Sequence, residues 1–347
     1  MSLATHSWAD VLNGVVAGED LTSEAARWAM GEILSGQATP SQIAGFAVAM
    51  RSKGETVEEI TALVDAMFEK ATPLSIPGRA LDIVGTGGDR SFSVNISSMS
   101  VIVAAGAGAL VVKHGNRSAS SKSGSADVLE ALGVRLDLDP DGVTAVAERA
   151  GITFCFAPIF HPALRHAGPA RRELGIATFF NLFGPLANPV RPAAQAIGCA
   201  DLSKAPVLAG VFAKRGADAM VFRGDDGLDE LTTTTTSTVW SVRDGSTQKS
   251  SLDPRDLGLR LASAEDLRGG DTDYNARVIL RLLDGETGPV RDAVVLNAGA
   301  ALAIHQGMTG DVLADVASGM QRATEALDSG AAKAALERWV KACAAVS

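Results

Sequence analysis

The sequence has few cysteines, and the 3 that it has lie far apart. Cys155, Cys199 and Cys343 are odd in number and scattered, so they predict neither a disulfide framework nor a zinc site. Such cysteine usage is typical of a reducing compartment, and we expect a cytoplasmic protein.

The chain also lacks a segment that would place it in or across a membrane. Residues 1–10 contain no basic region followed by an apolar core, as a signal peptide would. The apolar region 101–112 is broken by Gly106 and Gly108 and is too short to span a bilayer. We therefore expect no membrane partner.

Positive charge is in short supply as well. Lys and Arg number 31 against 40 Asp and Glu, which gives a net charge of −9 at pH 7. A protein that holds a nucleic-acid backbone needs clustered positive charge, so we expect no nucleic-acid partner. An anionic small molecule would have to be captured by a local group of cations.

Hydrophobic residues, by contrast, make up 46% of the 347 residues, which is ample for a core in a chain too long for one small domain. Residues 7–70 have apolar side chains at helical spacing, and Pro73 and Pro77 then form a stiff connector. Beyond it, short apolar strands alternate with helices. The pattern predicts an α/β fold, with a small helical domain over residues 1–72 and a large domain with a mainly parallel central sheet over residues 78–347.

Apolar runs and their flanking glycines and prolines predict the individual elements. We expect helices over residues 25–34, 40–53, 58–68, 99–106, 125–133, 140–151, 163–174, 204–215, 275–283, 291–305 and 309–345, the last broken at Gly330. We expect strands over residues 81–84, 109–112, 153–156, 195–199, 219–222 and 239–242, and a polar hairpin or loop over residues 243–258. The threonine run 232–236 is expected to be extended, because its side chains are β-branched.

A glycine-rich loop follows the strand predicted at residues 81–84. Residues 85–89 read Gly-Thr-Gly-Gly-Asp, and 3 glycines in 4 positions cost backbone entropy that a packed domain needs a reason to keep. The usual reason is a turn that bares backbone N–H groups to a bound anion. The loop is neither a Walker loop, since no Gly-Lys-Ser/Thr follows, nor the Gly-x-Gly-x-x-Gly dinucleotide motif.

A second loop of this kind follows the next predicted strand. Residues 113–117 read Lys-His-Gly-Asn-Arg and lead into a serine-rich stretch, residues 118–125. Right-handed crossovers place both loops at the carboxyl edge of a parallel sheet, where such sheets bind ligands. The cations Lys113, Arg117 and Lys122 among these hydroxyls predict a phosphate or pyrophosphate ligand.

Four acidic residues lie within 6 positions after the strand predicted at residues 219–222, namely Asp225, Asp226, Asp229 and Glu230. One interpretation is a solvated acidic turn. The other is a Mg²⁺ site, because a bound pyrophosphate needs its charge neutralised. Mg²⁺ binds through one or two carboxylates together with phosphate oxygens and water.

Several of these stretches resemble the anthranilate phosphoribosyltransferase family. The likeness is carried by residues 85–89, 95–98, 113–117 with Ser120 and Ser121, 161–166 and 171–175, and it extends to residues 36–38 and 53–56. It implies the fold of nucleoside phosphorylases and phosphoribosyltransferases, in which a helical segment around residues 163–190 joins the first domain in space. It also implies a homodimer formed through the helical domain.

The resemblance implies transfer of the 5-phosphoribosyl group from phosphoribosyl pyrophosphate to the amine of anthranilate, which gives N-(5-phosphoribosyl)anthranilate and pyrophosphate in tryptophan biosynthesis. It assigns the donor to Gly85, Gly88, Asp89, Ser93, Asn95, Ile96, Ser97, Ser98, Lys113, Ser120, Ser121 and Ser125. It assigns anthranilate to Gly85, Asn116 and Arg171, whose guanidinium suits a carboxylate. Mg²⁺, as a pair of ions, is assigned to Ser97, Asp229 and Glu230.

The roles of three further residues are less specific. His114 is the natural group for proton transfer in catalysis near neutral pH. A histidine between a strand and a glycine is equally often a packing residue, so both roles stay open. Asp225 and Asp226 are expected on the surface.

The chain departs from the family pattern at Ala177, where an arginine is expected, and at Ser98, where threonine is commoner. The first change removes a cation near the acceptor, and the second keeps a hydroxyl. A pyrimidine nucleoside phosphorylase and a non-enzymatic nucleic-acid-binding relative are the alternatives. The sequence of residues 113–117 argues against the phosphorylase, and the negative net charge argues against the nucleic-acid-binding relative.

Overall fold

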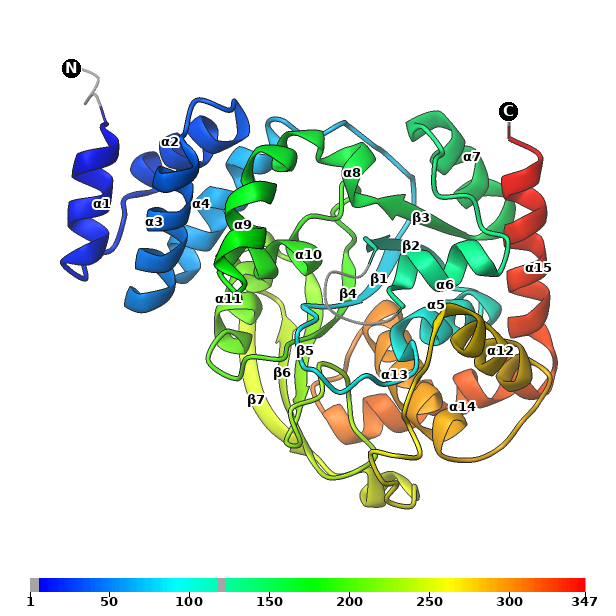
Figure 1. Ribbon diagram of the computed structural model, residues 1–347. Helices are drawn as coiled ribbons and strands as arrows, with labels where there is room; N and C mark the ends of the chain where they lie inside the picture. The colour runs from blue at the N-terminus through cyan, green and yellow to red at the C-terminus, as the bar shows by residue number, and fades with distance from the viewer. Residues whose placement is uncertain (1–5, 118–122, 347) are drawn as a thin grey trace.

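The computed structural model describes residues 6–117 and 123–346 of the chain. Helices α1 (Trp8–Val16), α2 (Ser23–Leu34), α3 (Pro40–Lys53) and α4 (Val57–Phe68) pack together at one end of the molecule (Figure 1). Each begins after a Ser or Thr whose side chain accepts a hydrogen bond from a backbone N–H of the first turn. This contact satisfies a donor that has no partner within the helix, so the local sequence sets where each helix begins.

A later segment of short helices packs against this helical end. It comprises α8 (Ala157–Phe160), η1 (Pro162–Ala167), α9 (Gly168–Leu174), η2 (Phe179–Leu182) and α10 (Phe183–Leu186). The rings of Phe46 on α3 and Phe179 meet edge to face with their centroids 5.5 Å apart. The continuous helix expected over residues 163–174 is divided, because Pro169 has no N–H with which to continue a preceding helix. The domain boundaries at residues 72 and 78 stay a prediction.

The central sheet has seven strands in the order β3-β2-β1-β4-β5-β6-β7. Strands β1 (Ala80–Gly85), β2 (Leu110–Gly115), β3 (Ile152–Phe156), β4 (Ala194–Gly198) and β5 (Asp218–Gly224) are parallel, and β6 (Ser237–Arg243) pairs antiparallel with both β5 and β7 (Ser246–Leu252). β6 and β7 form a hairpin whose turn places Asp244 and Gly245 at φ of 49° and 71°. The hairpin or loop expected over residues 243–258 is thus confirmed only in part, because its first strand lies before residue 243 and a short helix occupies residues 254–257. The α/β fold with a mainly parallel sheet is confirmed.

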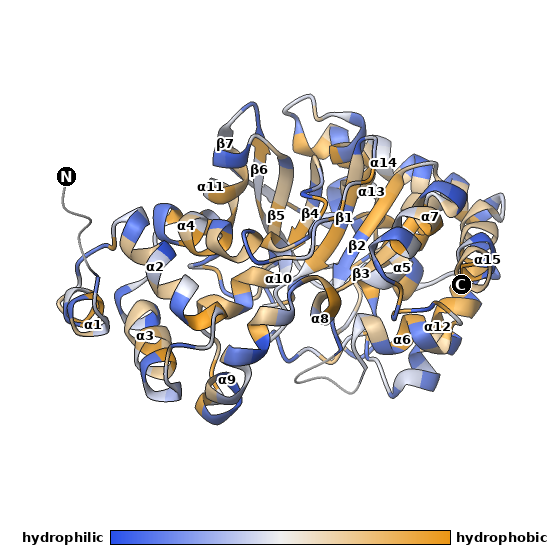
Figure 2. Cartoon of the chain, turned by 90° about the horizontal axis from the view of Figure 1, so that it is seen from above, coloured by the Kyte–Doolittle hydropathy of each residue, from blue (hydrophilic) through white to orange (hydrophobic). Residues whose placement is uncertain are grey.

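Alternate residues of the strands face two separate hydrophobic cores. Ala196, Met220 and Phe222 belong to one cluster of buried residues, whereas Ile197 and Val221, their neighbours in sequence, belong to the other. Because successive side chains point to opposite faces of a strand, a sheet covered on both faces reads as a continuous apolar run. Figure 2 shows these hydrophobic strands in the middle of the molecule, between helices.

Helices cover both faces of the sheet. Among the remaining helices, those that contact strands are α5 (Ile96–Gly106), α7 (Pro140–Ala150), α11 (Ala205–Arg215), α13 (Pro289–Gln306), α14 (Val312–Asp328) and α15 (Ala331–Ala344). Outside them, α6 (Ser125–Ala131) packs on α5, α12 (Thr272–Leu283) on α6, and η3 (Pro254–Leu257) on α14. The predicted break at Gly330 is confirmed, because this residue separates α14 from α15 in a left-handed conformation. Among the helices of the described residues, none is both long and apolar enough to cross a membrane.

The prediction that threonines 232–236 form an extended segment is wrong. Bends occupy residues 233–235, and the strand β6 begins only at Ser237. The hydroxyls of Thr232 and Thr234 donate to the carboxylate of Asp226, and the Thr236 hydroxyl donates to that of Asp225. Side-chain hydrogen bonds to a nearby turn therefore override the extended preference of β-branched residues.

Candidate active site

Four neighbouring strands end in glycine at the same edge of the sheet. These are β2, β1, β4 and β5, which end at Gly115, Gly85, Gly198 and Gly224. A Cβ on Gly198 would lie 1.6 Å from the main-chain oxygen of Asp229, and one on Gly85 would lie 2.2 Å from its Oδ2. Glycine is therefore required at both positions, because residues 225–230, which we call the acidic loop, pack directly against the strand ends.

The acidic loop and the glycine-rich loop are locked together. The backbone N–H of Gly87 donates to Oδ2 of Asp229 over 2.7 Å. Gly87 and Gly88 have φ of 67° and 85°, in the region that favours glycine. The Thr86 backbone N–H also donates to the Gly198 carbonyl over 2.9 Å, which anchors the loop to β4. The sequence predicts that the loops after the first two strands lie at the carboxyl edge of the sheet. The parallel strands β1 and β2 do end there, at Gly85 and Gly115, but Lys113 and His114, expected in the second loop, lie within β2.

Three carboxylates converge at this edge. Burial and the charge of Asp89 raise the pKa of Glu230 to about 8, against the opposing effect of the Lys113 charge. Burial also raises the pKa of Asp229 well above its ordinary value, together with the charges of Asp89 and Glu230. Negative charge is therefore unfavourable here unless a cation is present.

These carboxylates fit a divalent cation only as part of its ligand set. Within residues 6–117 and 123–346, no three His, Cys, Asp or Glu side chains form a complete metal-binding group. Mg²⁺ normally takes one or two carboxylates and completes its octahedron with water and substrate phosphates. The donor set at Asp229 and Glu230 suits that kind of site, and the hydroxyl of Ser97 lies 3.5 Å from the Lys113 ammonium.

Lys113 is buried beneath the loops, with 1% of its surface exposed. Its ammonium donates to the Ile83 carbonyl over 2.5 Å and lies 3.5 Å from Oγ of Ser97. Burial lowers the pKa of Lys113, and the carboxylates of Asp82 and Glu230 counter this effect. The ammonium of Lys113 is therefore held beneath the loops by its contacts with Ile83 and Ser97 and by the neighbouring carboxylates.

His114 is buried next to Lys113 and makes the contacts of a packing residue. Its Nδ1 lies 2.9 Å from the Gly184 carbonyl, and its ring meets that of His161 edge to face at 5.7 Å. Burial, followed by the charge of His161, lowers the pKa of His114 to about 3. A pKa this far below neutral pH makes the ring a weak base, and together with its contacts to Gly184 and His161 this favours the packing role over the catalytic one.

Asp82 is a site residue that the sequence reading missed. It lies in β1 with no exposed surface, and its carboxylate accepts from the His114 N–H over 3.2 Å and from Nδ2 of Asn188 over 2.9 Å. Burial raises the pKa of Asp82 to about 6, and Lys113 opposes the shift. A carboxylate inside an otherwise apolar strand was the signal that could have identified it.

The other predicted donor residues line the start of α5 and α6. Asn95 precedes α5, Ile96, Ser97 and Ser98 form its first turn, and Ser125 opens α6. Ser98 is fully buried, and its hydroxyl has no hydrogen-bond partner among the described residues. Ser93 pairs with Arg268 in an isolated bridge. Ser120 and Ser121 lie outside the described residues.

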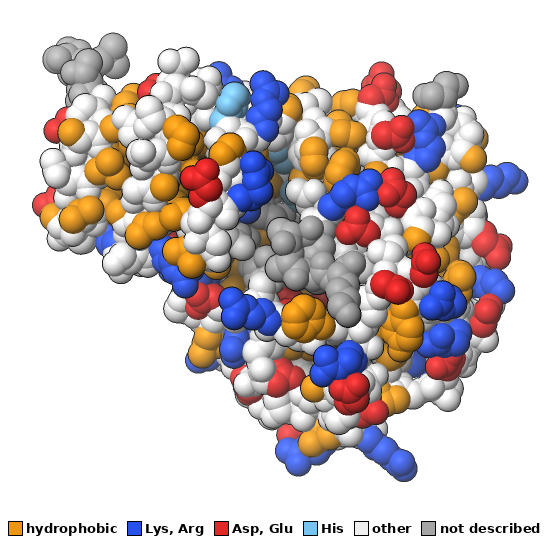
Figure 3. Space-filling view, in the orientation of Figure 1, with side chains coloured by type: hydrophobic (Ala, Val, Ile, Leu, Met, Phe, Trp, Pro, Cys, Tyr) orange, Lys and Arg blue, Asp and Glu red, His pale blue; other side chains and the backbone are white. Residues whose placement is uncertain are grey.

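The cations and the predicted acceptor residues lie around this edge. Arg117 forms ion pairs with Asp127 and Glu130, at 2.9 and 2.8 Å, so its charge is already balanced. Arg171 is exposed on α9, and its guanidinium lies 5.2 Å from the ring centroid of Phe180. Figure 3 shows Lys and Arg side chains on both rims of the hollow where the helical end meets the α/β part.

Asn116 and the segment around Ala177 complete this side. Asn116 is exposed after β2, and its Oδ1 accepts from the N–H of Arg117 over 2.7 Å. At Ala177, where the sequence pattern lacks an arginine, the guanidinium of Arg51 donates to the backbone carbonyl. A cation from α3 therefore reaches this segment.

Comparison with known proteins agrees with the geometry. The model of the glycosyl transferase family a/b domain matches residues 77–333, and that of the family's helical bundle domain matches residues 9–71. An anthranilate phosphoribosyltransferase of Nocardioides sp. is 64% identical over 97% of this chain and 99% of its own, and one of Thermobifida fusca is 57% identical over 98% and 97%. The chain belongs to the anthranilate phosphoribosyltransferase family.

Solved structures of anthranilate phosphoribosyltransferases share the fold. The enzyme of Thermus thermophilus superposes with a TM-score of 0.89 at 40% identity, over 96% of this chain and 99% of its own. That of Saccharomyces cerevisiae in complex with PRPP and Mg superposes with 0.88 at 26% identity, over 97% and 98%. The predicted family and fold class are confirmed, and the phosphorylase and nucleic-acid-binding alternatives lose their support.

The neutral state of His114 has a measurable effect on stability. Its pKa is about 3 in the folded chain against an ordinary value of 6.5, so the unfolded chain binds the extra proton as the pH falls below 6.5. We expect the free energy of unfolding between pH 6 and 5 to fall more steeply in the wild type than in His114→Asn, by about 1 kcal/mol per pH unit. Denaturant titrations at several pH values measure both slopes, and equal slopes would mean that His114 is charged in the fold.

Proposed function

We propose that the protein transfers the 5-phosphoribosyl group of phosphoribosyl pyrophosphate to the amine of anthranilate. The products are N-(5-phosphoribosyl)anthranilate and pyrophosphate, and the reaction is a step of tryptophan biosynthesis. The observation that carries the proposal is the meeting of the loop 85–89 with Asp229, Glu230 and Lys113 at one edge of the sheet. Such an edge can hold a pyrophosphate together with a cation.

The chemistry explains why the site needs no covalent nucleophile. Breaking the C1–O bond of the donor builds positive charge on the ribose and negative charge on the departing pyrophosphate. The protein must stabilise that leaving group and hold the amine in line with C1. Backbone N–H groups of Gly85, Gly88 and Asp89 would bind pyrophosphate oxygens, because this loop carries no side chain at three of its five positions.

The remaining donor contacts come from several elements. Ser93, Asn95, Ile96, Ser97, Ser98, Lys113, Ser120, Ser121 and Ser125 would complete the cradle around the phosphates and the ribose. Asp229, Glu230 and Ser97 would hold Mg²⁺, as two ions, and the raised pKa values of the two acids support a cation there. When bound, Mg²⁺ neutralises the charge that develops on the pyrophosphate.

The acceptor would lie on the helical side of the site. Arg171 would bind the anthranilate carboxylate, with Asn116 and Gly85 beside it. The ring of Phe180 lies under the Arg171 guanidinium and limits where it can turn. A planar guanidinium held in one orientation can form two parallel hydrogen bonds with the carboxylate of anthranilate.

The first test follows the fluorescence of anthranilate in a mixture with the purified protein, phosphoribosyl pyrophosphate and Mg²⁺. We expect the signal to fall with time and the fall to stop when a chelator is added. Glu230→Gln should raise the Mg²⁺ concentration for half-maximal rate by about tenfold or more, which corresponds to ~1.4 kcal/mol of binding.

Asp225→Asn is the matched control for Glu230→Gln. It removes the same charge from the same turn, at a carboxylate bonded to Thr236 and Thr238. Its Mg²⁺ requirement should equal that of the wild type. No loss of fluorescence with folded protein would contradict the proposed reaction, and equal Mg²⁺ curves for all three proteins would contradict the role of Glu230.

Arg171→Ala should weaken acceptor binding selectively. A charge-assisted hydrogen bond contributes about 1.5–3 kcal/mol, so the KM for anthranilate should rise by about tenfold to a hundredfold. The KM for phosphoribosyl pyrophosphate should change little. Arg172→Ala, on the exposed side of the same helix, is the control. An unchanged KM for anthranilate in Arg171→Ala would refute the assignment.

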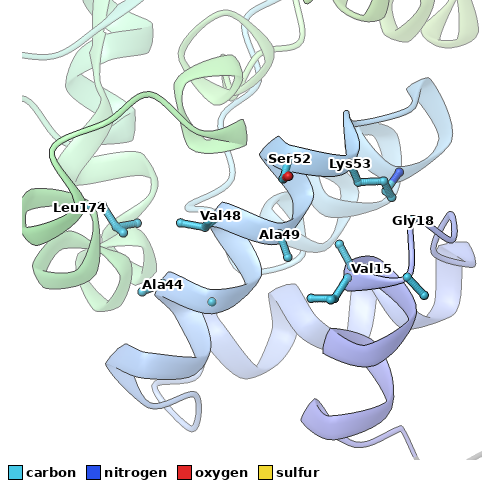
Figure 4. A pocket seen from close by; sticks show the side chains of 11 residues that line it. Val15, Gly18, Ala44, Val48, Ala49, Ser52, Lys53 and Leu174 are labelled. Atoms are coloured by element: carbon cyan, nitrogen blue, oxygen red, sulfur yellow. The ribbon is translucent and has the colours of Figure 1, made fainter.

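We also propose a cytoplasmic homodimer that forms through the helical end. All three cysteines are unpaired and buried, as in a reducing compartment. A groove of about 690 Å³ lies between α1 and α3, with Leu174 at its edge. Figure 4 shows Val48 pointing toward Leu174 and Ala49 toward Val15. Val16 and Val48 are 75% and 41% exposed, and a second copy would cover these apolar side chains.

Val48→Asp should shift the protein from dimer to monomer in sedimentation velocity at micromolar concentration. The charge would be buried without a partner if the dimer formed. Leu313→Asp is the matched control, because Leu313 is 40% exposed on α14, outside the groove. A monomeric wild type would rule out the dimer, and dissociation by both variants would rule out this groove as its interface.

A further inference from the structure

We infer that Asn275 is a positioning residue for donor binding, which acts by fixing the side-chain amide of Asn95. The inference rests on the proposed function, in which Asn95 contacts phosphoribosyl pyrophosphate. Asn275 lies in the first turn of α12 and is 2% exposed, and both ends of its side-chain amide are hydrogen-bonded within the protein, to Gly270 and to Asn95.

The segment before α12 pairs with the loop that carries the donor residues. The N–H of Val94 donates to the Leu267 carbonyl over 2.9 Å, and that of Gly269 donates to the Phe92 carbonyl over 2.7 Å. A Cβ on Gly269 would lie 2.6 Å from the main-chain oxygen of Ser93. Residues 267–269 thus form a backbone support for residues 92–94, and Figure 1 shows the two segments passing beside each other.

Asn275 connects this support to Asn95. Its Oδ1 accepts from the N–H of Gly270 over 2.9 Å, and its Nδ2 donates to Oδ1 of Asn95 over 2.9 Å. Because the Gly270 N–H can only donate, the Asn275 atom facing it must be the oxygen, and the atom facing Asn95 must be the NH₂ group. Asn95 must then present its own oxygen to Asn275.

This orientation decides where the amino group of Asn95 points. Nδ2 of Asn95 donates to the Ser123 carbonyl over 3.2 Å, and among residues 6–117 and 123–346 no other acceptor takes its second hydrogen. A phosphate or ribose oxygen of the donor would be such an acceptor. If the Asn95 amide were turned around, its oxygen would face the Ser123 carbonyl and repel it.

The same contacts keep Asn95 from capping its own helix. Asn95 is the N-cap of α5, yet its side chain makes no capping hydrogen bond, whereas Ser7, Thr22, Thr39 and Thr56 all cap theirs. Asparagine is among the best N-cap residues, so the contact with Asn275 diverts it from its usual role. The first turn of α5 is satisfied by another group instead, because the Ser97 backbone hydrogen-bonds to the carboxylate of Glu230.

Asn275→Asp tests the inference with almost no change in shape. The carboxylate can still accept from Gly270 but now repels Oδ1 of Asn95. We expect the KM and the calorimetric Kd for phosphoribosyl pyrophosphate to rise about tenfold, and kcat and the KM for anthranilate to stay within about twofold. Asp271→Ala is the control: it removes the N-cap of the same helix, so it should lower stability without raising the donor Kd.

A double-mutant comparison separates positioning from a structural effect. In an Asn95→Ala background, Asn275→Asp should raise the donor Kd by less than about twofold, since its target is gone. Additive effects, or an unchanged donor Kd in the single variant, would overturn the inference. A fall in kcat together with a rise in both KM values and a lower thermal stability would also overturn the inference, because it would indicate a general structural effect. If Asn275→Asp does not fold, Asn275→Ala is measured by the same criteria.

The test of Asn275 by the donor Kd does not require anthranilate, so it can be separated from the test of the proposed reaction. If the wild type binds phosphoribosyl pyrophosphate in calorimetry but does not consume anthranilate, the proposed reaction fails while the role of Asn275 can still be measured from the donor Kd. If the wild type does not bind phosphoribosyl pyrophosphate at all, both fail.

Discussion

The site depends on how closely the acidic loop approaches the ends of β1 and β4. The main chain of Asp229 occupies the space where Gly198 would otherwise carry a Cβ, and its carboxylate occupies the corresponding space at Gly85. This contact brings Asp229 to the N–H of Gly87 and sets Glu230 close to Lys113. A larger side chain at either glycine would push the carboxylates away from the loop that they face.

Charge balance around Lys113 follows from that approach. Asp82 lies on one side of the buried ammonium, and Glu230 and Asp229 lie toward the open edge. Burial raises the pKa values of Asp229 and Glu230, and the negative charge of neighbouring carboxylates adds to the shift, so a cation is favoured there. An anion with several phosphates and its metal ions would supply both the positive charge and the oxygen ligands that the protein alone does not.

Much of this arrangement could be predicted from local sequence. The limits of α2 to α4, the strand ends and the break at Gly330 depend on caps, prolines and glycines that act on nearby backbone. The threonine run was misread, because its hydroxyls bond to Asp225 and Asp226 on the preceding turn. The sequence cannot decide whether His114 is a catalytic or a packing residue, because the burial that keeps its ring neutral comes from α10 and His161.

The sequence by itself determined the types of group at the site: a loop of glycines, a lysine after the second strand and a pair of acids after a later one. These follow from short motifs, whose backbone preferences do not need the rest of the chain. Only the tertiary structure decided which of these groups meet. Gly87 and Asp229 are separated by 142 residues, and Asn95 and Asn275 by 180, so their contacts exist only once the sheet and its helices have assembled. The pKa values of the buried groups were decided there too, because burial and neighbouring charges are properties of the packed fold.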